Sequence, residues 1–122
     1  MVASLKDGIK ALGGTFQDIG VVSTPILHFV TRCINDPSYG EPTEEGYYSK
    51  LCNAYKKVVK GKPVLSKIYI DAANGVGAPK MEEFGKRLGS SVVYEIVNGD
   101  IISLGKLNHN VREFARFICL LA

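Results

Sequence analysis

The sequence predicts an α/β fold, more narrowly a βαβ-containing mixed sheet with flanking helices. Residues 66–71 and 91–97 are short stretches rich in β-branched and aromatic side chains, and a helix-like stretch at 79–89 separates them. A strand, a helix and a strand over about thirty residues form a βαβ unit, for which a right-handed parallel pairing is expected. The composition agrees, because 46% hydrophobic and 22% charged residues are typical of a globular chain.

The first elements are predicted from capping residues and apolar spacing. Ser4 is the expected N-cap of a first helix, and Asp7 completes a capping-box pattern. One helical face carries Leu5, Ile9 and Leu12. The glycine pair at 13 and 14 can end this helix, and the apolar stretch 16–22 (FQDIGVV) predicts a buried strand. A short helix over 25–33 follows, with Thr24 as its N-cap and a proline at its first position.

A longer helix is predicted after Thr43, which is its N-cap. Its expected apolar stripe consists of Tyr48, Leu51, Cys52, Tyr55, Val58 and Val59. The helix of the βαβ unit should begin at Pro79 and present Met81, Phe84 and Leu88 on one face. The last residues, 110–122, can form a helix with Asn110 and Glu113 as a capping box. Its apolar face would carry Phe114, Phe117, Ile118 and Leu121.

Charge and cysteine content restrict the classes of partner and the cellular compartment that we expect. The net charge is +3, and the densest basic stretch, at 56–62, fits a solvated helix end at least as well as a nucleic-acid patch. No 18-residue apolar run is present and the N-terminus lacks the apolar core of a signal peptide, so no membrane association is expected. Cys33, Cys52 and Cys119 lack CxxC spacing and predict free thiols in the cytoplasm.

The turn after the first strand of the βαβ unit is the most suggestive motif. Gly75 and Gly77 follow a strand and precede a helix, an arrangement that can aim backbone N–H groups at a phosphate. A dinucleotide fingerprint needs a third glycine at position 80, which is lysine, and the P-loop spacing is also unmet. A tight βα turn without a ligand is therefore favoured over a nucleotide- or phosphate-binding module.

Other residues with chemical potential are scattered. His28 is expected to pack on the short helix, and His109 lacks a partner at metal spacing. Ser23 has no Gly-x-Ser-x-Gly context, and no spacing pairs the carboxylates of Asp7, Asp18 and Asp71. Tyr47, Tyr48 and Tyr55 are better explained as packing residues than as base-stacking platforms. No catalytic, cofactor-binding or metal-binding residue is predicted from the pattern.

Longer motifs resemble one known family. The stretches DGIKALGG, DIGVVSTPILHFV, EGYYSKL, IDAANGVGAPKM and GKLNH resemble the phosphoacetylglucosamine mutase family of the α-D-phosphohexomutase superfamily, in its order and at about its spacing. The resemblance covers residues 4–109. It implies an isomerase of carbohydrate metabolism with four domains. Such an enzyme interconverts N-acetylglucosamine 6-phosphate and 1-phosphate for UDP-N-acetylglucosamine biosynthesis, using a phosphoserine and Mg²⁺.

The resemblance also implies a domain map. Residues 1–34 correspond to the C-terminal part of the first domain, 35–42 to a linker and 43–110 to the N-terminal part of the second domain. The family pattern is lost near Asn110, where Val111 stands in place of a family cysteine, so 111–122 is a divergent tail. An alternative exon, a frameshift or a mispredicted gene end would each produce such a change.

The same resemblance places the chemistry outside this sequence. The Thr-Ala-Ser-His-Asn-Pro phosphoserine loop would precede residue 1, and the Asp-Gly-Asp-x-Asp-Arg metal loop would follow the GKLNH stretch. No family catalytic, metal or sugar-phosphate residue falls on this sequence, so neither activity nor Mg²⁺ binding is expected of this chain alone. The alternative hypothesis is a non-catalytic interaction protein, which would self-associate or pair with full-length mutase or another partner.

Overall fold

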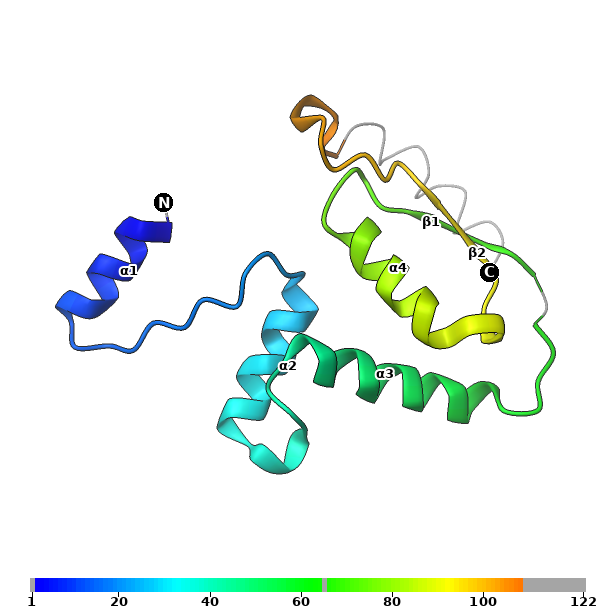
Figure 1. Ribbon diagram of the computed structural model, residues 1–122, viewed down its shortest axis with the longest axis horizontal. Coiled ribbons are helices and arrows are strands. Elements are labelled where there is room, and N and C mark those ends of the chain that lie inside the picture. Colours follow the sequence, from blue (N-terminus) through cyan, green and yellow to red (C-terminus); the bar gives the residue numbers. More distant parts are fainter. Residues whose placement is uncertain (1, 65, 109–122) are drawn as a thin grey trace.

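The computed structural model describes residues 2–64 and 66–108 and confirms the α/β class (Figure 1). The elements in chain order are α1 (Val2–Ala11), α2 (Thr24–Asn35), η1 (Pro37–Tyr39), α3 (Glu44–Val59), β1 (Ile68–Asp71), α4 (Gly77–Leu88), η2 (Gly89–Ser91), β2 (Tyr94–Val97) and η3 (Leu104–Lys106). Within these described ranges, no helix is long and apolar enough to cross a membrane.

The βαβ unit has the predicted parallel pairing. β1 pairs with β2 from Ile68 opposite Tyr94 to Asp71 opposite Val97, and α4 connects the two strands. Both strands are shorter than the predicted 66–71 and 91–97. The second strand begins later because the 3₁₀ turn η2 follows directly after α4. Gly89, with φ 56°, caps α4 and starts this turn before the chain extends into β2. Figure 1 shows α4 running alongside the two strands.

The core lies where α2, α3 and α4 meet. Its buried members are Ile26, Phe29, Val30, Cys33 and Tyr48, with Tyr47 and Phe84 packed against them. Aromatic rings join the helices: the centroids of Phe29 and Tyr47 are 5.5 Å apart, and those of Tyr48 and Phe84 are 4.8 Å apart. These edge-on contacts link α2 to α3 and α3 to α4, so this part of the fold shares one hydrophobic core.

α3 begins as predicted but buries less than predicted. The Thr43 hydroxyl accepts a hydrogen bond from the Gly46 N–H at 3.0 Å, which confirms the N-cap. Tyr48 and Cys52 are buried, whereas Leu51 and Val58 are 41% and 66% exposed, so the predicted six-residue stripe was too wide. The reason is that the main neighbours of α3 are α2 and α4, and side chains that face neither helix stay exposed.

The N-terminal region departs most from the sequence prediction. α1 forms, but it begins at Val2, so Ser4 lies inside its first turn and is not the N-cap. The predicted strand at 16–22 is wrong, because these residues pair with no strand and Gly20, with φ 76°, and the bend at Val21 interrupt the backbone. A segment without a neighbouring strand has no ladder to join within the described residues. Figure 1 shows α1 standing apart from the other helices, joined to α2 by this extended segment.

Two further helix starts differ by one or two residues. Ser23, not Thr24, occupies the N-cap position of α2, and Pro25 lies in the first turn as predicted. The helix continues beyond the predicted residue 33 to Asn35. α4 begins at Gly77, so Pro79 occupies its third position; a proline fits there because first-turn N–H groups have no intrahelical acceptor.

The domain boundaries at 34, 42 and 110 remain predictions. The stretch assigned to the linker contains η1, whose Tyr39 ring lies 5.8 Å from the Phe29 ring, and α2 on one side of it packs against α3 on the other. The predicted tail helix at 110–122 lies outside the described residues, as do His109 and Cys119. Cys33 and Cys52 are free and buried, as the cysteine pattern predicted.

Candidate functional site

The turn between β1 and α4 lies at the carboxyl ends of two parallel strands. Ligands of open α/β sheets bind at such edges, so this turn is the natural place to look for a site. Its backbone is unusual, because Ala73 and Asn74 have φ angles of 53° and 55°, in the left-handed region. Asparagine tolerates this region better than most residues. The shape of the turn therefore depends on residues besides its two glycines.

The N–H groups of this turn donate mainly to the protein itself. The Ala73 N–H donates to Asp71 Oδ1 at 2.9 Å, and the Asn74 N–H donates to the Asn98 carbonyl. The Gly75 N–H donates to the Ala72 carbonyl at 2.9 Å. A phosphate-binding loop instead leaves consecutive N–H groups unpaired and aimed at one point. The geometry therefore supports the interpretation of residues 71–77 as a structural βα turn.

Asn74 fastens this turn to the segment that follows β2. Its side-chain amide donates to the Lys106 carbonyl at 2.9 Å, and its Oδ1 accepts the Asp100 N–H at 3.0 Å. The Asn108 N–H donates to the Ala73 carbonyl at 2.9 Å. The ends of both strands are thereby held in one hydrogen-bonded unit.

The two aspartates of this unit, Asp71 and Asp100, are structural as well. Asp71 Oδ1 also accepts from the Asn98 amide at 3.1 Å, while its Oδ2 is buried and has no hydrogen-bond partner among the described residues. Asp100 accepts the N–H groups of Ile102 and Ser103 at 3.1 Å, and the Lys106 ammonium lies 2.8 Å from its Oδ2. The hydrogen bonds from Lys106 and Ser103 hold the pKa of Asp100 well below its ordinary value.

A cavity of about 400 Å³ opens beside the turn, between it and the 101–107 segment. Asn74, Gly75 and Pro79 line one side, and Ile101 and Leu107 line the other. Lys80 is the ionisable residue among the described lining residues, and its ammonium lies 2.8 Å from Glu44 Oε1. The cavity is thus mostly apolar, and its one cation already has a carboxylate partner.

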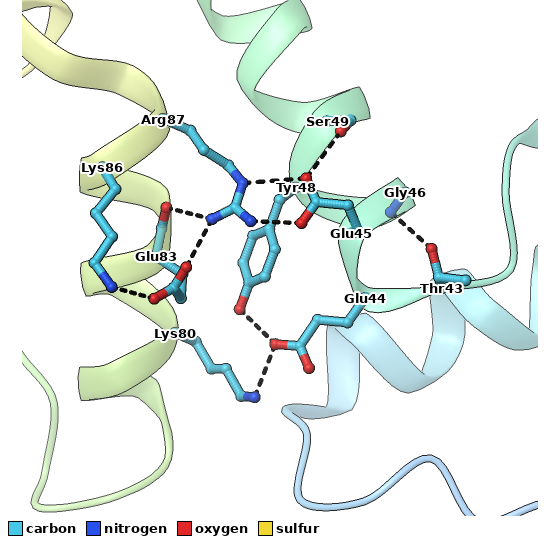
Figure 2. Close-up of polar contacts among 10 residues, drawn as sticks. All are labelled: Thr43, Glu44, Glu45, Gly46, Tyr48, Ser49, Lys80, Glu83, Lys86 and Arg87. Atoms are coloured by element: carbon cyan, nitrogen blue, oxygen red, sulfur yellow. Dashed lines mark hydrogen bonds and ion pairs between the residues drawn. The ribbon is translucent and has the colours of Figure 1, made fainter.

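A polar network joins α3 to α4 behind this cavity (Figure 2). Glu44 Oε1 accepts from both Lys80 and the hydroxyl of buried Tyr48, the latter at 2.6 Å. The pKa of Tyr48 is raised far above its ordinary value. Burial disfavours the charged phenolate, and the bond to the Glu44 carboxylate disfavours a second negative charge beside it. The network positions α4, which carries the turn at its N-terminal end.

Arg87 forms the other half of the network. Its guanidinium bonds Glu45 Oε2 at 2.5 Å and Glu83 Oε2 at 2.9 Å, and lies 4.6 Å from the Tyr48 ring centroid. These contacts raise the pKa of Arg87, chiefly through the hydrogen bonds to Glu45 and Glu83. Figure 2 shows the guanidinium between the two helices, so this one side chain bridges α3 and α4.

Comparison with known proteins identifies the family, although no family model matches the chain. It is 44% identical over 107 residues to phosphoacetylglucosamine mutase of Candida albicans and 38% identical over 111 residues to that of Homo sapiens. These alignments cover 84% and 87% of the chain. The chain belongs to the phosphoacetylglucosamine mutase family.

Solved structures of this family match the fold as well. The Aspergillus fumigatus N-acetylphosphoglucosamine mutase, in complex with GlcNAc-6P and magnesium, superposes with a TM-score of 0.81 at 41% identity over 88% of the chain. An apo-form N-acetylglucosamine-phosphate mutase of the α-D-phosphohexomutase superfamily gives 0.72 at 44% identity over 80%. The chain spans about a fifth of its relatives: 20% of the two curated sequences, and 23% and 18% of the two solved chains.

The remaining residues singled out in the sequence lie on α1, on α2 and on the segment between them. The expectation that His28 packs is wrong, because it is exposed on α2; Ser23 is the N-cap of that helix, and Asp18 Oδ1 accepts the Gly20 N–H at 2.9 Å. Asp7 lies on exposed α1. Across residues 2–64 and 66–108, no group of three or more His, Cys, Asp or Glu side chains could hold a metal ion.

The tyrosines and the hydrogen-bonded turn show what pattern reasoning found and missed. Tyr47 and Tyr48 are packing residues of the core, as predicted, and the Tyr55 hydroxyl donates to the Ser91 carbonyl at 3.3 Å. The sequence did not predict that the Asn74 side chain would hydrogen-bond to both Lys106 and Asp100. The available signal was an Asn-Gly pair at the end of one strand and a second at the end of the next.

Proposed function

We propose that this chain is a structural segment of a phosphoacetylglucosamine mutase, the enzyme that interconverts N-acetylglucosamine 6-phosphate and N-acetylglucosamine 1-phosphate. The observation that carries the proposal is the turn at residues 71–77. The N–H groups of Ala73, Asn74 and Gly75 donate inside the protein, in a chain that shares 44% identity with a mutase of that name. The segment supports the cleft of the enzyme and leaves the phosphoryl transfer to residues elsewhere.

The residues described do not fit the magnesium of this reaction. Mg²⁺ takes oxygen ligands in octahedral geometry. Asp71 and Asp100, the carboxylates nearest the turn, are engaged by Asn98 and by Ser103 and Lys106, and no metal-holding group occurs in the described ranges. We therefore assign Mg²⁺ and the phosphoserine to other parts of a complete mutase, and to none of the described residues of this chain.

We place the reaction in the cytoplasm, on the route to UDP-N-acetylglucosamine. The free, buried thiols of Cys33 and Cys52 support a reducing compartment. The product of the mutase, a sugar 1-phosphate, is the form that a nucleotidyl transfer consumes. Aminosugar phosphate is accordingly the small-molecule partner of the complete enzyme.

A segment swap tests the proposal. The matching segment of the Candida albicans mutase would be replaced by residues 4–108 of this chain, and the chimera assayed for conversion of N-acetylglucosamine 6-phosphate in the presence of Mg²⁺. We expect turnover within about tenfold of the parent enzyme, because structural segments tolerate substitution when packing is kept. A chimera that is folded and monodisperse but lacks turnover would refute the proposal.

A control in the same chimera distinguishes a structural role of the turn from a direct role in the reaction. Asn74→Ala removes the clamp, meaning the Asn74 side-chain hydrogen bonds to Lys106 and Asp100 that join the two strand ends. It should therefore lower the thermal stability of the chimera. Turnover per folded molecule at low temperature should stay close to that of the unsubstituted chimera. A loss of turnover without a loss of stability would instead assign Asn74 a direct role in the reaction.

Pairing with the rest of a mutase polypeptide is a second candidate function. Ile68 and Tyr69 on β1 are 49% and 55% exposed, and exposed apolar strand residues favour association with another chain. Co-expression of the chain with a mutase lacking the matching segment tests this. Co-purification in a fixed ratio is expected if the two parts complement each other, and separate elution would exclude pairing.

A further inference from the structure

A second hollow, of about 620 Å³, lies between α2, η1 and α3. Its apolar walls are the rings of Phe29, Tyr39 and Tyr47, and its polar lining includes His28, Arg32 and Lys50. None of the residues that line it is part of the turn at 71–77 or of the network in Figure 2. The proposed mutase function therefore does not account for this hollow.

Two cations lie close to one aromatic ring. The Lys50 ammonium lies 3.2 Å from the Tyr39 ring centroid, and the Arg32 guanidinium carbon lies 5.3 Å from the same centroid. Lys50 also donates to the Tyr39 carbonyl and lies 5.9 Å from the Phe29 centroid. Each contact is favourable by itself, and together they keep two positive charges beside the Tyr39 ring.

Negative charge in the hollow does not balance these two cations. Arg32 pairs with Asp36 at 3.0 Å, and Lys50 makes no ion pair with any residue in the described ranges. The described residues that line the hollow include no carboxylate. Positive charge against a low-dielectric aromatic wall concentrates the electric field and attracts anions.

The wall is held in place before any ligand arrives. Asp36 Oδ1 caps η1 by accepting the Ser38 N–H at 3.2 Å and the Ser38 hydroxyl at 2.6 Å. Gly40, with φ 154°, lets the chain pass close to Phe29, because a Cβ there would lie 3.2 Å from the Phe29 ring. The Tyr39 ring is thereby fixed 5.8 Å from Phe29, and a prepared site costs less ordering on binding.

We propose that this hollow binds a small phosphate monoester whose organic group is planar. The phosphate dianion matches the two cations Arg32 and Lys50, and guanidinium and ammonium groups are the usual phosphate donors. The planar group stacks against the Tyr47 ring, Tyr39 holds the two cations in place, and the His28 imidazole supplies a further polar contact. The proposal uses no residue of the turn at 71–77, so failure of the segment swap would leave it unaffected.

Titration of the complete 122-residue chain with phenyl phosphate tests the site, using calorimetry and the amide NMR signals of α2, η1 and α3. We expect saturable one-to-one binding with shifts centred on Tyr39 and Lys50. Lys50→Gln and Arg32→Gln should each weaken binding by about tenfold or more, the loss expected for one charge-assisted hydrogen bond. Tyr39→Leu should weaken it too, and thermal unfolding of each variant checks that the fold is kept.

Matched controls make the result decisive. Lys57→Gln removes an exposed lysine of the same helix outside the hollow and should leave the affinity unchanged. Benzoate keeps the ring and has one negative charge fewer, and methyl phosphate keeps the phosphate without the ring, so both should bind more weakly. Absence of saturation, equal losses for Lys57→Gln and Lys50→Gln, or benzoate binding as tightly as phenyl phosphate would each overturn the proposal.

Discussion

The helices of residues 2–22 and of residues 24–100 carry the same kind of apolar periodicity, yet only the second region buries it. α1 has no buried residue, and Leu5 on its apolar face is 60% exposed. α2, which is two residues longer, buries Ile26, Phe29, Val30 and Cys33. Periodicity thus specifies which face of a helix is apolar, and a neighbouring element decides whether that face leaves water.

The two regions differ in what they have to pack against. α2 meets α3, and α3 in turn meets α4, which is joined to both strands. Residues 16–22 would need a neighbouring strand to form a ladder, and none is present in the described residues. α1 therefore buries no side chain, whereas Ile19 and Val22, in the segment before α2, pack against the core of the second region.

The largest expected loss of folding stability comes from shortening a buried side chain of the shared core. Ile26 is 1% exposed, so Ile26→Ala should lower the free energy of unfolding by about 2–5 kcal/mol. Leu5→Ala is the matched change on α1 and should alter it by less than about 0.5 kcal/mol. Urea unfolding followed by circular dichroism measures both. Equal losses for the two variants would show that α1 is packed against a surface and that the two regions are alike.

The same glycine substitution should act in opposite directions in the two regions. Gly85 of α4 lies under the Tyr94 ring, where a Cβ would be 2.5 Å from Tyr94 Cζ, so Gly85→Ala should destabilise by about 1–3 kcal/mol. Gly8 of α1 has open space around it, and Gly8→Ala should favour that helix by up to about 1 kcal/mol.

Thermal melts and helix content by circular dichroism measure this pair of changes. A neutral Gly85→Ala would mean that the β2 strand can move away from α4 at little cost. The contact between Tyr94 and α4 would then not define the βαβ unit.

Sequence alone predicted the βαβ unit, the Thr43 cap and the aromatic packing of Tyr48, because these follow from local spacing and capping chemistry. It failed for the strand at 16–22, since an apolar stretch does not reveal whether a partner strand is close. It also missed the clamp formed by Asn74, Asn98 and Asp100, because those contacts join residues 24–26 positions apart. Non-local contacts of this kind are set by the fold and have no spacing signature.

The clamp at the strand ends is expected to matter less than the core. Asn74→Ala removes two side-chain hydrogen bonds and leaves alanine at φ 55°, so it should cost about 1–3 kcal/mol. Asn74→Gly restores the backbone freedom but not the bonds, and should recover about 1 kcal/mol of that loss. Asn53→Ala on the exposed face of α3 is the control and should be nearly neutral. Unfolding in urea compares the three.

The smallest expected effect is an acid-dependent loss at the α3–α4 network. Burial raises the pKa of Glu44, but hydrogen bonds from Lys80 and Tyr48 outweigh it and bring the pKa below its ordinary value. A carboxyl group with a lowered folded-state pKa stabilises the fold above its unfolded-state pKa. That stability is lost as the pH falls through the folded-state value.

Thermal melts between about pH 6 and pH 3 should therefore show a steeper acid loss for the unsubstituted chain than for Glu44→Gln, with a difference of about 1 kcal/mol or less. Glu82→Gln, on the exposed side of α4, should keep the steeper profile. A Glu44→Gln profile that matches the unsubstituted chain would mean that the network does not couple the two helices.

Whether this segment supports mutase chemistry or performs it is tested most directly by a coupled assay on the purified 122-residue chain. The assay would supply N-acetylglucosamine 6-phosphate, Mg²⁺ and a bisphosphate activator. Because the N–H groups of Ala73, Asn74 and Gly75 already donate inside the protein, we predict no turnover above a blank without protein. Turnover that rises with protein concentration and disappears on Gly75→Val would contradict this, because it would show that the turn itself takes part in the reaction.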